Sequence, residues 1–193
     1  MISTKKLEDA KKIVIMFHGR GGSAKDILSL SHHLPSEPCY VAITAKNNQW
    51  YPLSFLEKKE LNNPYLQNSL EEVKKLINTA RMYVEDKDIY LLGFSQGACL
   101  ALEFLSNNPS NFGGVFALSG GLIGADEELK SKELNTKILI GCSENDPFIP
   151  IKRVYDSKKI LEDKGANMTL ITYPGSSHTI TQKELDFIKK ELS

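Results

Sequence analysis

Six short apolar segments, separated by polar and helical stretches, constrain the fold of this chain more than any other feature. They are rich in β-branched residues and lack the apolar-polar alternation of a half-exposed strand, so each predicts a strand buried on both faces. Their sequences are KKIVIMFHG, YVAITA, DIYLLGFS, GVFALSG, KILIGCS and MTLITYP. Because helical patterns lie between them, we expect an α/β fold with a mostly parallel sheet of about six strands and helices on both faces. Active sites in such sheets lie at the carboxyl ends of the strands.

The intervening stretches show the periodicity of amphipathic helices. Residues 23–34 begin with an S-x-x-D start, and apolar residues recur at helical spacing there and in residues 66–84. A further stripe covers residues 151–161 and ends before Gly165, a residue type that favours helix termination. Residues 181–192 begin with a capping box and are predicted to direct an apolar stripe toward the core.

A serine between two glycines lies where one of these strands passes directly into a helix. Gly93, Ser95 and Gly97 match G-x-S-x-G, between the strand DIYLL and the helical run QGACLALEFL. Such a turn forces the serine to a positive φ, and Cβ atoms at either glycine would collide with their surroundings. The turn lifts the hydroxyl above the sheet and aims the N-terminus of the helix at it. The alternative is an ordinary turn with a capping serine.

A serine hydroxyl needs a base before it can act as a nucleophile, and the base needs an acid to orient it. In a fold of this kind the chain order is Ser, then Asp or Glu, then His. His178 is the single histidine after Ser95, in GSSHTI beyond a predicted strand. Asp146 lies in ENDPFIP beyond the preceding strand, and we prefer it to Glu144 because Pro147 fixes the turn beside it.

The anion that forms when a serine attacks a carbonyl needs two donors. The backbone N–H of Gln96 supplies one, and the loop HGRGGSA after the first strand is expected to supply the second through the backbone N–H of Arg20. Glycines in that loop permit a close approach of the backbone, and His18 is expected to brace the loop rather than to transfer protons. The Arg20 side chain is a candidate to attract an anionic group of the substrate.

The segments FHGRGGS, GFSQGA, ENDPFIP and SSHT together resemble the serine carboxylesterase and phospholipase family of α/β hydrolases, which includes the acyl-protein thioesterases. The resemblance spans about residues 13 to 190. It implies an α/β-hydrolase fold and hydrolysis of carboxylic esters or thioesters through an acyl-enzyme. Ser95, Asp146 and His178 match the catalytic triad of the family, and Arg20 and Gln96 match its oxyanion positions.

Two features of the sequence indicate a branch within that family. Thioesterase members usually carry a small or apolar residue where this chain has Arg20, and the segment NNQWYPLSF is similar to bacterial esterases rather than to the protein-deacylating branch. In that segment we expect Trp50 and Tyr51 to form a wall of the substrate pocket, with aromatics that only plug the sheet edge as the alternative. Too few residues separate ALSG from KILI for a helical cap domain.

Composition limits the partners of the protein. Lys plus Arg and Asp plus Glu number 24 each, so no net charge is available to attract nucleic acid or anionic lipid. The three cysteines lack the spacing of a metal site or a disulfide framework and are expected to be reduced. The first residues do not read as a secretory signal and no apolar run of membrane-spanning length occurs, which predicts a cytoplasmic protein without stable membrane insertion.

Two rival interpretations use the same residues. GRGGSA fits a dinucleotide-binding loop, but YVAITA is followed by Lys46 instead of the acidic residue that would hold the ribose, and Glu37 precedes that strand. The second interpretation is a non-catalytic binding protein on the same scaffold. The sequence does not support it, because no candidate member of the triad is missing. The sequence therefore predicts a single domain over residues 1–193, a serine hydrolase of small carboxylic esters without metal or cofactor. Thioesters, lysophospholipids, acylated proteins and a homodimer remain open alternatives.

Overall fold

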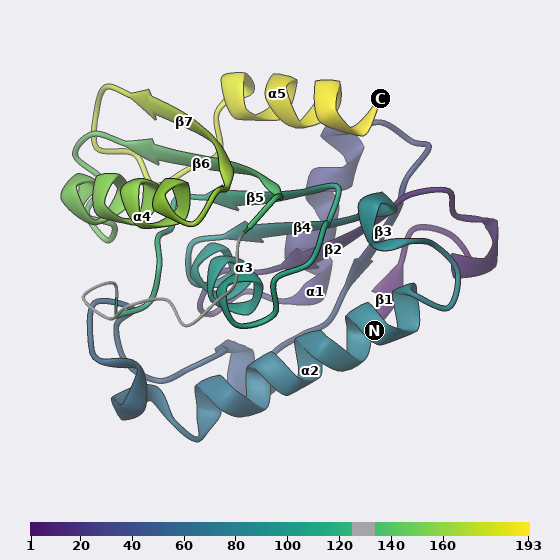
Figure 1. Ribbon diagram of the computed structural model, residues 1–193, viewed down its shortest axis with the longest axis horizontal. Coiled ribbons are helices and arrows are strands. Elements are labelled where there is room, and N and C mark those ends of the chain that lie inside the picture. The colour runs from purple at the N-terminus through teal and green to yellow at the C-terminus, as the bar shows by residue number, and fades with distance from the viewer. Residues whose placement is uncertain (125–133) are drawn as a thin grey trace.

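A seven-stranded sheet forms the centre of the molecule (Figure 1). The computed structural model describes residues 1–124 and 134–193. The strand order is β1-β3-β2-β4-β5-β6-β7, in which β1 pairs antiparallel with β3 and every other neighbouring pair is parallel. The strands are β1 (Ile2–Ser3), β2 (Ile13–Phe17), β3 (Cys39–Ala42), β4 (Ile89–Phe94), β5 (Gly114–Leu118), β6 (Lys137–Ser143) and β7 (Asn167–Tyr173).

All six predicted strands are confirmed, and β1 is an addition. Each predicted apolar segment contains one of the parallel strands β2 to β7. Strand β1 has only two residues, both exposed, and Ile2 pairs with Ala42 at the edge of the sheet. A strand this short and this exposed has no apolar pattern from which it could be predicted.

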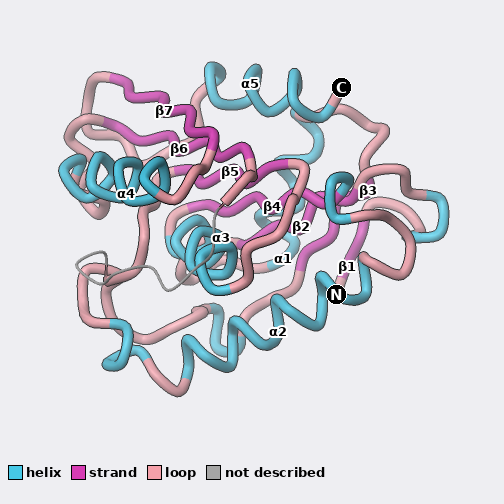
Figure 2. The backbone as a smooth tube through the Cα atoms, viewed as in Figure 1, coloured by secondary structure: helices cyan, strands magenta, loops and turns pink. Residues whose placement is uncertain are grey.

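Helices cover both faces of the sheet, as expected (Figures 1 and 2). In β2, Ile13, Ile15 and Phe17 pack on the face covered by α2, α3 and α4, whereas Val14 and Met16 pack on the face covered by α1 and α5. This double coverage explains why the apolar run is unbroken. The helices are α1 (Ala24–Leu28), α2 (Tyr65–Ala80), α3 (Gln96–Asn107), α4 (Ile151–Asp163) and α5 (Gln182–Leu192).

The ends of the helices agree with the sequence in some places and differ in others. Ser23 caps α1 by accepting the N–H of Asp26, and the capping box of α5 is present at Thr181. The first helix is shorter than predicted, because α1 ends at Leu28 and the chain continues as a 3-10 helix, η2 (Ser29–His33). The Ser29 hydroxyl donates to the Asp26 carbonyl there, a local bond of the kind that competes with helix continuation.

The carboxyl ends of β2, β4, β6 and β7 lead into the loops that carry the candidate site. Residues 125–133 lie between β5 and β6, so the expectation that no cap is inserted there falls partly outside the described residues. The three cysteines are buried and free. None of the helices within residues 1–124 and 134–193 combines the length and apolar character needed to cross a membrane.

Candidate active site

Ser95 lies on a strained turn between β4 and α3. Its φ and ψ are 53° and −117°, a backbone conformation that costs on the order of 1–3 kcal/mol for a residue with a side chain. The Ser95 N–H donates to the carbonyl of Leu118 at 2.8 Å, which ties the turn to β5. A Cβ atom at Gly93 would lie 2.2 Å from the Gly97 carbonyl oxygen, and one at Gly97 would lie 2.2 Å from that of Phe17. Both glycines are therefore required by the turn, as the motif predicts.

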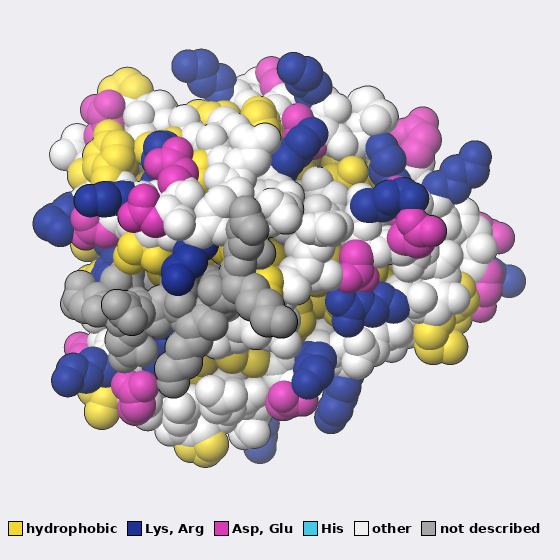
Figure 3. Space-filling model, viewed as in Figure 1, with side chains coloured by type: hydrophobic (Ala, Val, Ile, Leu, Met, Phe, Trp, Pro, Cys, Tyr) yellow, Lys and Arg dark blue, Asp and Glu magenta, His cyan; other side chains and the backbone are white. Residues whose placement is uncertain are grey.

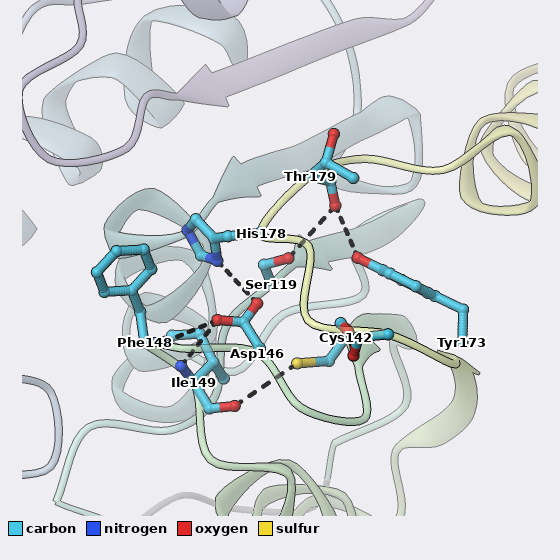
Figure 4. Close-up of polar contacts among 10 residues, drawn as sticks. Ser119, Cys142, Asp146, Phe148, Ile149, Tyr173, His178 and Thr179 are labelled. Carbon is cyan, nitrogen blue, oxygen red and sulfur yellow. Dashed lines mark hydrogen bonds and ion pairs between the residues drawn. The ribbon is translucent and has the colours of Figure 1, made fainter.

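His178 and Asp146 form a hydrogen-bonded pair at the ends of β7 and β6 (Figure 4). The His178 Nδ1 atom lies 2.8 Å from Asp146 Oδ2, and the Asp146 side chain is 0% exposed while that of His178 is 16% exposed. Asp146 Oδ1 also accepts the N–H groups of Phe148 at 2.9 Å and Ile149 at 3.0 Å. Because a carboxylate only accepts, Nδ1 carries the hydrogen and Nε2 is left with a lone pair. Glu144, the alternative acid, is exposed.

Two aromatic rings enclose the His178 imidazole. Its centroid lies 5.0 Å from that of Phe94, the residue before Ser95, and 5.0 Å from that of Phe148 in an edge-to-face arrangement. Ser95 and His178 line the same cavity. The structure thus brings together residues that lie far apart in the sequence, at the shared carboxyl edge of the sheet.

Two hydroxyls that sequence reasoning missed hold the loop after His178 (Figure 4). The carbonyl oxygen of Thr179 accepts the hydroxyl of Tyr173 at 2.8 Å and that of Ser119 at 3.5 Å. Burial raises the pKa of Tyr173 to about 12, so the phenol remains a donor at neutral pH. The sequence carries no signal for these contacts, because both residues occur inside ordinary strand-and-turn patterns.

The two residues expected to supply oxyanion donors lie on separate elements near Ser95. Gln96 is the first residue of α3 and Arg20 follows β2, and both line the cavity that contains Ser95. Within residues 1–124 and 134–193, neither backbone N–H donates a hydrogen bond. The N-terminal, positive end of the α3 dipole lies directly after Ser95. The arrangement suits an anion adjacent to the serine.

The Gln96 side chain fixes the loop that precedes α2. Its Oε1 accepts the N–H of Trp50 at 3.0 Å and its Nε2 donates to the carbonyl of Tyr51 at 2.7 Å. Ser69 of α2 donates to the carbonyl of Trp50 at 2.6 Å. Sequence reasoning assigned Gln96 only a backbone role, whereas its side chain joins the turn at Ser95 to the loop that contains Trp50 and Tyr51.

Trp50 does not line the cavity that contains Ser95, in contrast to the expected pocket wall. The indole is 1% exposed, packs edge-on against Phe17 and donates through Nε1 to the His18 carbonyl at 2.8 Å. Burial of this large ring stabilises the loop from its inner side. The composition of the loop could not show that the ring is buried rather than part of the cavity lining. Tyr51 does line the cavity, together with Pro52.

His18 braces the glycine-rich loop, as predicted. It is 1% exposed, its Nε2 accepts the Ala45 N–H at 3.0 Å, and its Nδ1 donates to the Gly19 carbonyl at 2.7 Å. These bonds define a neutral tautomer, and burial lowers the pKa of this histidine. A histidine held in this way on both nitrogens is structural.

The Arg20 side chain makes contacts that differ from the expected attraction of an anionic substrate group. Its guanidinium donates to Gln49 Oε1 at 2.8 Å and to the carbonyls of Pro52 at 2.9 Å and Leu53 at 2.7 Å. Because three of its donors are engaged, the group serves as a tie between the glycine-rich loop and the loop before α2.

The cavity beside Ser95 has a volume of about 650 Å³. Its lining is mostly apolar and includes Tyr51, Phe55, Cys99 and Ile149. Among the described residues, no cluster of three or more His, Cys, Asp or Glu side chains could hold a metal ion. The site can therefore present one hydroxyl, one imidazole and two amides to an apolar ligand that carries a carbonyl.

Known proteins share this sequence and architecture. Residues 2–193 match the family described as phospholipase/carboxylesterase. The crystal structure of a phospholipase/carboxylesterase from Dyadobacter fermentans is 37% identical to this chain, with a TM-score of 0.94 and coverage of 99% of this chain and 94% of that one. Acyl-protein thioesterase 1 of Kluyveromyces lactis is 27% identical over 97% of this chain and 93% of its own length. Carboxylesterase SOBER1 of Arabidopsis thaliana is 23% identical over 93% and 89%, respectively.

The higher identity to the Dyadobacter protein agrees with the bacterial esterase branch indicated by the sequence. The seven-stranded sheet has the α/β-hydrolase architecture, with one strand more than expected. The chain belongs to the phospholipase/carboxylesterase family of α/β hydrolases and is a carboxylic ester hydrolase.

Proposed function

We propose that this protein hydrolyses small carboxylic esters through an acyl-enzyme formed on Ser95. The observation that carries the proposal is the Asp146–His178 hydrogen bond beside the cavity that Ser95 lines. The histidine keeps a lone pair on Nε2, the atom that must accept the serine proton. Asp146 would orient the imidazole and stabilise its charged form.

The proposed reaction has two halves. In the first, Ser95 Oγ attacks the ester carbonyl, its proton passes to His178, and the resulting oxyanion is stabilised by the N–H groups of Arg20 and Gln96. The leaving alcohol takes the proton from His178 as the carbon–oxygen bond breaks, and the acyl group remains on the serine. In the second, water gives a proton to His178 and attacks the acyl-enzyme carbonyl, and as the bond to Ser95 Oγ breaks the proton passes from His178 to that oxygen and the acid is released.

The cavity supports acyl groups of limited length. Tyr51 and Cys99, which line it, are each 1% exposed, so the acyl group would lie against buried side chains. The Arg20 contacts hold the facing loop in place. These features favour small esters over the long acyl groups of lipidated proteins. Because acyl-protein thioesterases are among the relatives, thioesters are the second class to test.

A labelling experiment combined with a substrate screen tests the proposal. A fluorophosphonate probe should label the protein once, and Ser95→Ala should abolish both labelling and ester hydrolysis. Oxygen esters and thioesters carrying acyl groups from acetyl to palmitoyl should show the highest kcat/KM at the short end. Ester hydrolysis that persists in Ser95→Ala, or a preference for palmitoyl thioesters, would overturn the corresponding part of the proposal.

A further inference from the structure

A tyrosine hydroxyl and a cysteine thiol meet at the wall of the cavity beside Ser95. Tyr51 and Cys99 both line that cavity, and each is 1% exposed. Their side chains interact with each other. Cys99 lies one helical turn after Ser95, and its N–H donates to the Ser95 carbonyl at 3.1 Å. The proposed mechanism uses neither side chain, although both line the space that a ligand of the serine must enter.

The Tyr51 hydroxyl is poorly satisfied for a buried polar group. Within residues 1–124 and 134–193, no nitrogen or oxygen atom forms a hydrogen bond with it, and its polar contact is the Cys99 thiol. The thiol accepts the Gly121 N–H at 3.5 Å, and sulfur is a weak acceptor. Burial of a hydroxyl without a good partner costs free energy. A ligand oxygen at this place would therefore replace a weak contact of the hydroxyl with a stronger one.

The surroundings of this pair favour a neutral ligand group over a charged one. Burial raises the pKa of Tyr51 well above its ordinary value of 10 and raises the pKa of Cys99 to about 11, so both groups keep their hydrogens at neutral pH. The guanidinium carbon of Arg20 lies 5.9 Å from the centroid of the Tyr51 ring, but its donors are engaged by Gln49 and two backbone carbonyls. A ketone oxygen loses less hydration on burial than a carboxylate does.

We propose that the preferred substrates are esters whose acyl chain carries a neutral hydrogen-bond acceptor, such as a ketone oxygen, which accepts from the Tyr51 hydroxyl. Side chains four residues apart on a helix have Cβ atoms about 5–6 Å apart, so Cys99 and its phenol partner lie a few carbon atoms beyond an ester carbonyl held at Ser95. This inference rests on the proposed function and narrows small esters in general to esters of oxo acids.

The test compares methyl esters that have a ketone on the fourth or fifth carbon of the acyl chain with the plain esters of the same length. Each kcat/KM is divided by the rate constant for hydroxide hydrolysis of the same ester, which removes differences in intrinsic reactivity. Wild type should prefer at least one of the two oxo esters by about tenfold, and Tyr51→Phe should bring that ratio close to one, because the donor is gone. The wild-type comparison decides the matter if Tyr51→Phe does not fold.

Two further variants are controls. Cys99→Ala keeps the phenol and should keep the preference for the oxo ester. Tyr83→Phe, at an exposed tyrosine that does not line the cavity, should keep both rates. The inference is overturned if wild type prefers neither oxo ester, or if Tyr51→Phe retains the preference. A wild-type protein that neither reacts with a fluorophosphonate nor cleaves any ester would instead contradict the proposed function.

Discussion

Asp146 has more hydrogen bonds than any other side chain drawn in Figure 4, although it lies in a loop. One carboxylate oxygen accepts two backbone N–H groups from the turn into α4, which leaves the other for His178. The side chain is thereby positioned by its own loop before any substrate binds. At the scale of single residues, the proposed chemistry depends on such contacts, which fix the orientation of an imidazole.

Asp146→Asn should lower kcat for a short ester by about ten-thousand-fold, by analogy with other serine hydrolases. The asparagine oxygen would keep the backbone N–H groups of Phe148 and Ile149, so its NH₂ group would face His178 and favour the tautomer without a lone pair on Nε2. Glu144→Gln, in the same loop but exposed, should retain full activity. Steady-state kinetics of both variants measure this, and equal losses would refute the assignment of the acid.

Tyr173→Phe should reduce kcat by less than about a hundredfold and leave KM unchanged. The phenol donates to the Thr179 carbonyl, so its loss would disturb the position of His178 without removing a group that lines the cavity beside Ser95. Tyr155→Phe, at an exposed tyrosine of α4, is the control and should behave as wild type. A change confined to KM would show that Tyr173 acts on substrate binding instead.

At the scale of elements, the loop between β3 and α2 is organised by its buried residues. Trp50, Tyr51 and Gln96 form one hydrogen-bonded unit that also reaches Ser69 of α2. Arg20 closes the same loop from the solvent side. These contacts and the buried indole hold the loop in one conformation.

Trp50→Phe should lower the free energy of unfolding by about 1–3 kcal/mol, since the buried carbonyl of His18 would lose its donor. Urea unfolding followed by circular dichroism measures the effect. Tyr65→Phe, at an exposed residue of α2, provides the control and should leave the stability unchanged. An unchanged stability in Trp50→Phe would mean that the indole bond contributes nothing to holding the loop.

The first turn of α5 introduces a dependence of stability on pH. Burial raises the pKa of Glu184 above its ordinary value of 4.5, although its Oε2 accepts the Thr181 N–H and hydroxyl at 2.6 Å each. In the described part of the chain its Oε1 has no hydrogen-bond partner, and a Cβ atom at Gly141 would lie 1.9 Å from it. The contribution of this group therefore stabilises the fold below pH 4.5 and is lost as pH rises through the raised pKa.

Glu184→Gln should remove the loss of stability that accompanies ionisation of Glu184, because the amide does not ionise. The free energy of unfolding of the variant should improve relative to wild type as pH rises from 4.5 to neutrality. Urea denaturation at several pH values measures the difference. Glu8→Gln, at an exposed glutamate, is the reference variant. Parallel curves for Glu184→Gln and wild type would contradict the burial of a charge at this position.

Those elements that depend on local patterns could be predicted, and those that depend on packing could not. The six parallel strands and the caps at Ser23 and Thr181 follow from apolar periodicity and short-range hydrogen bonding. The two-residue strand β1 and the inward burial of Trp50 follow from tertiary contacts, and the early end of α1 coincides with a side-chain bond of Ser29 that the apolar periodicity does not show. The hydroxyls of Tyr173 and Ser119 contribute only through a backbone carbonyl, which no residue pattern encodes.

At the scale of the whole molecule, the topology brings the site together. Strands β2, β4, β6 and β7 are parallel, so their carboxyl ends converge on one edge, and each delivers one part of the candidate machinery there. This convergence could be predicted from the order of motifs along the chain. On the face seen in Figure 3, basic and acidic side chains are interspersed, in keeping with a formal net charge of zero. We therefore expect ester recognition to depend little on ionic strength.

The central claim is that an imidazole brought from the far end of the chain activates the hydroxyl of Ser95. Mass spectrometry of the protein quenched during turnover of p-nitrophenyl acetate tests it most directly. The account predicts one acetyl group on the peptide that contains Ser95, absent in Ser95→Ala and strongly reduced in His178→Ala. An acetyl group on another residue, or one that forms equally fast without the histidine, would contradict it.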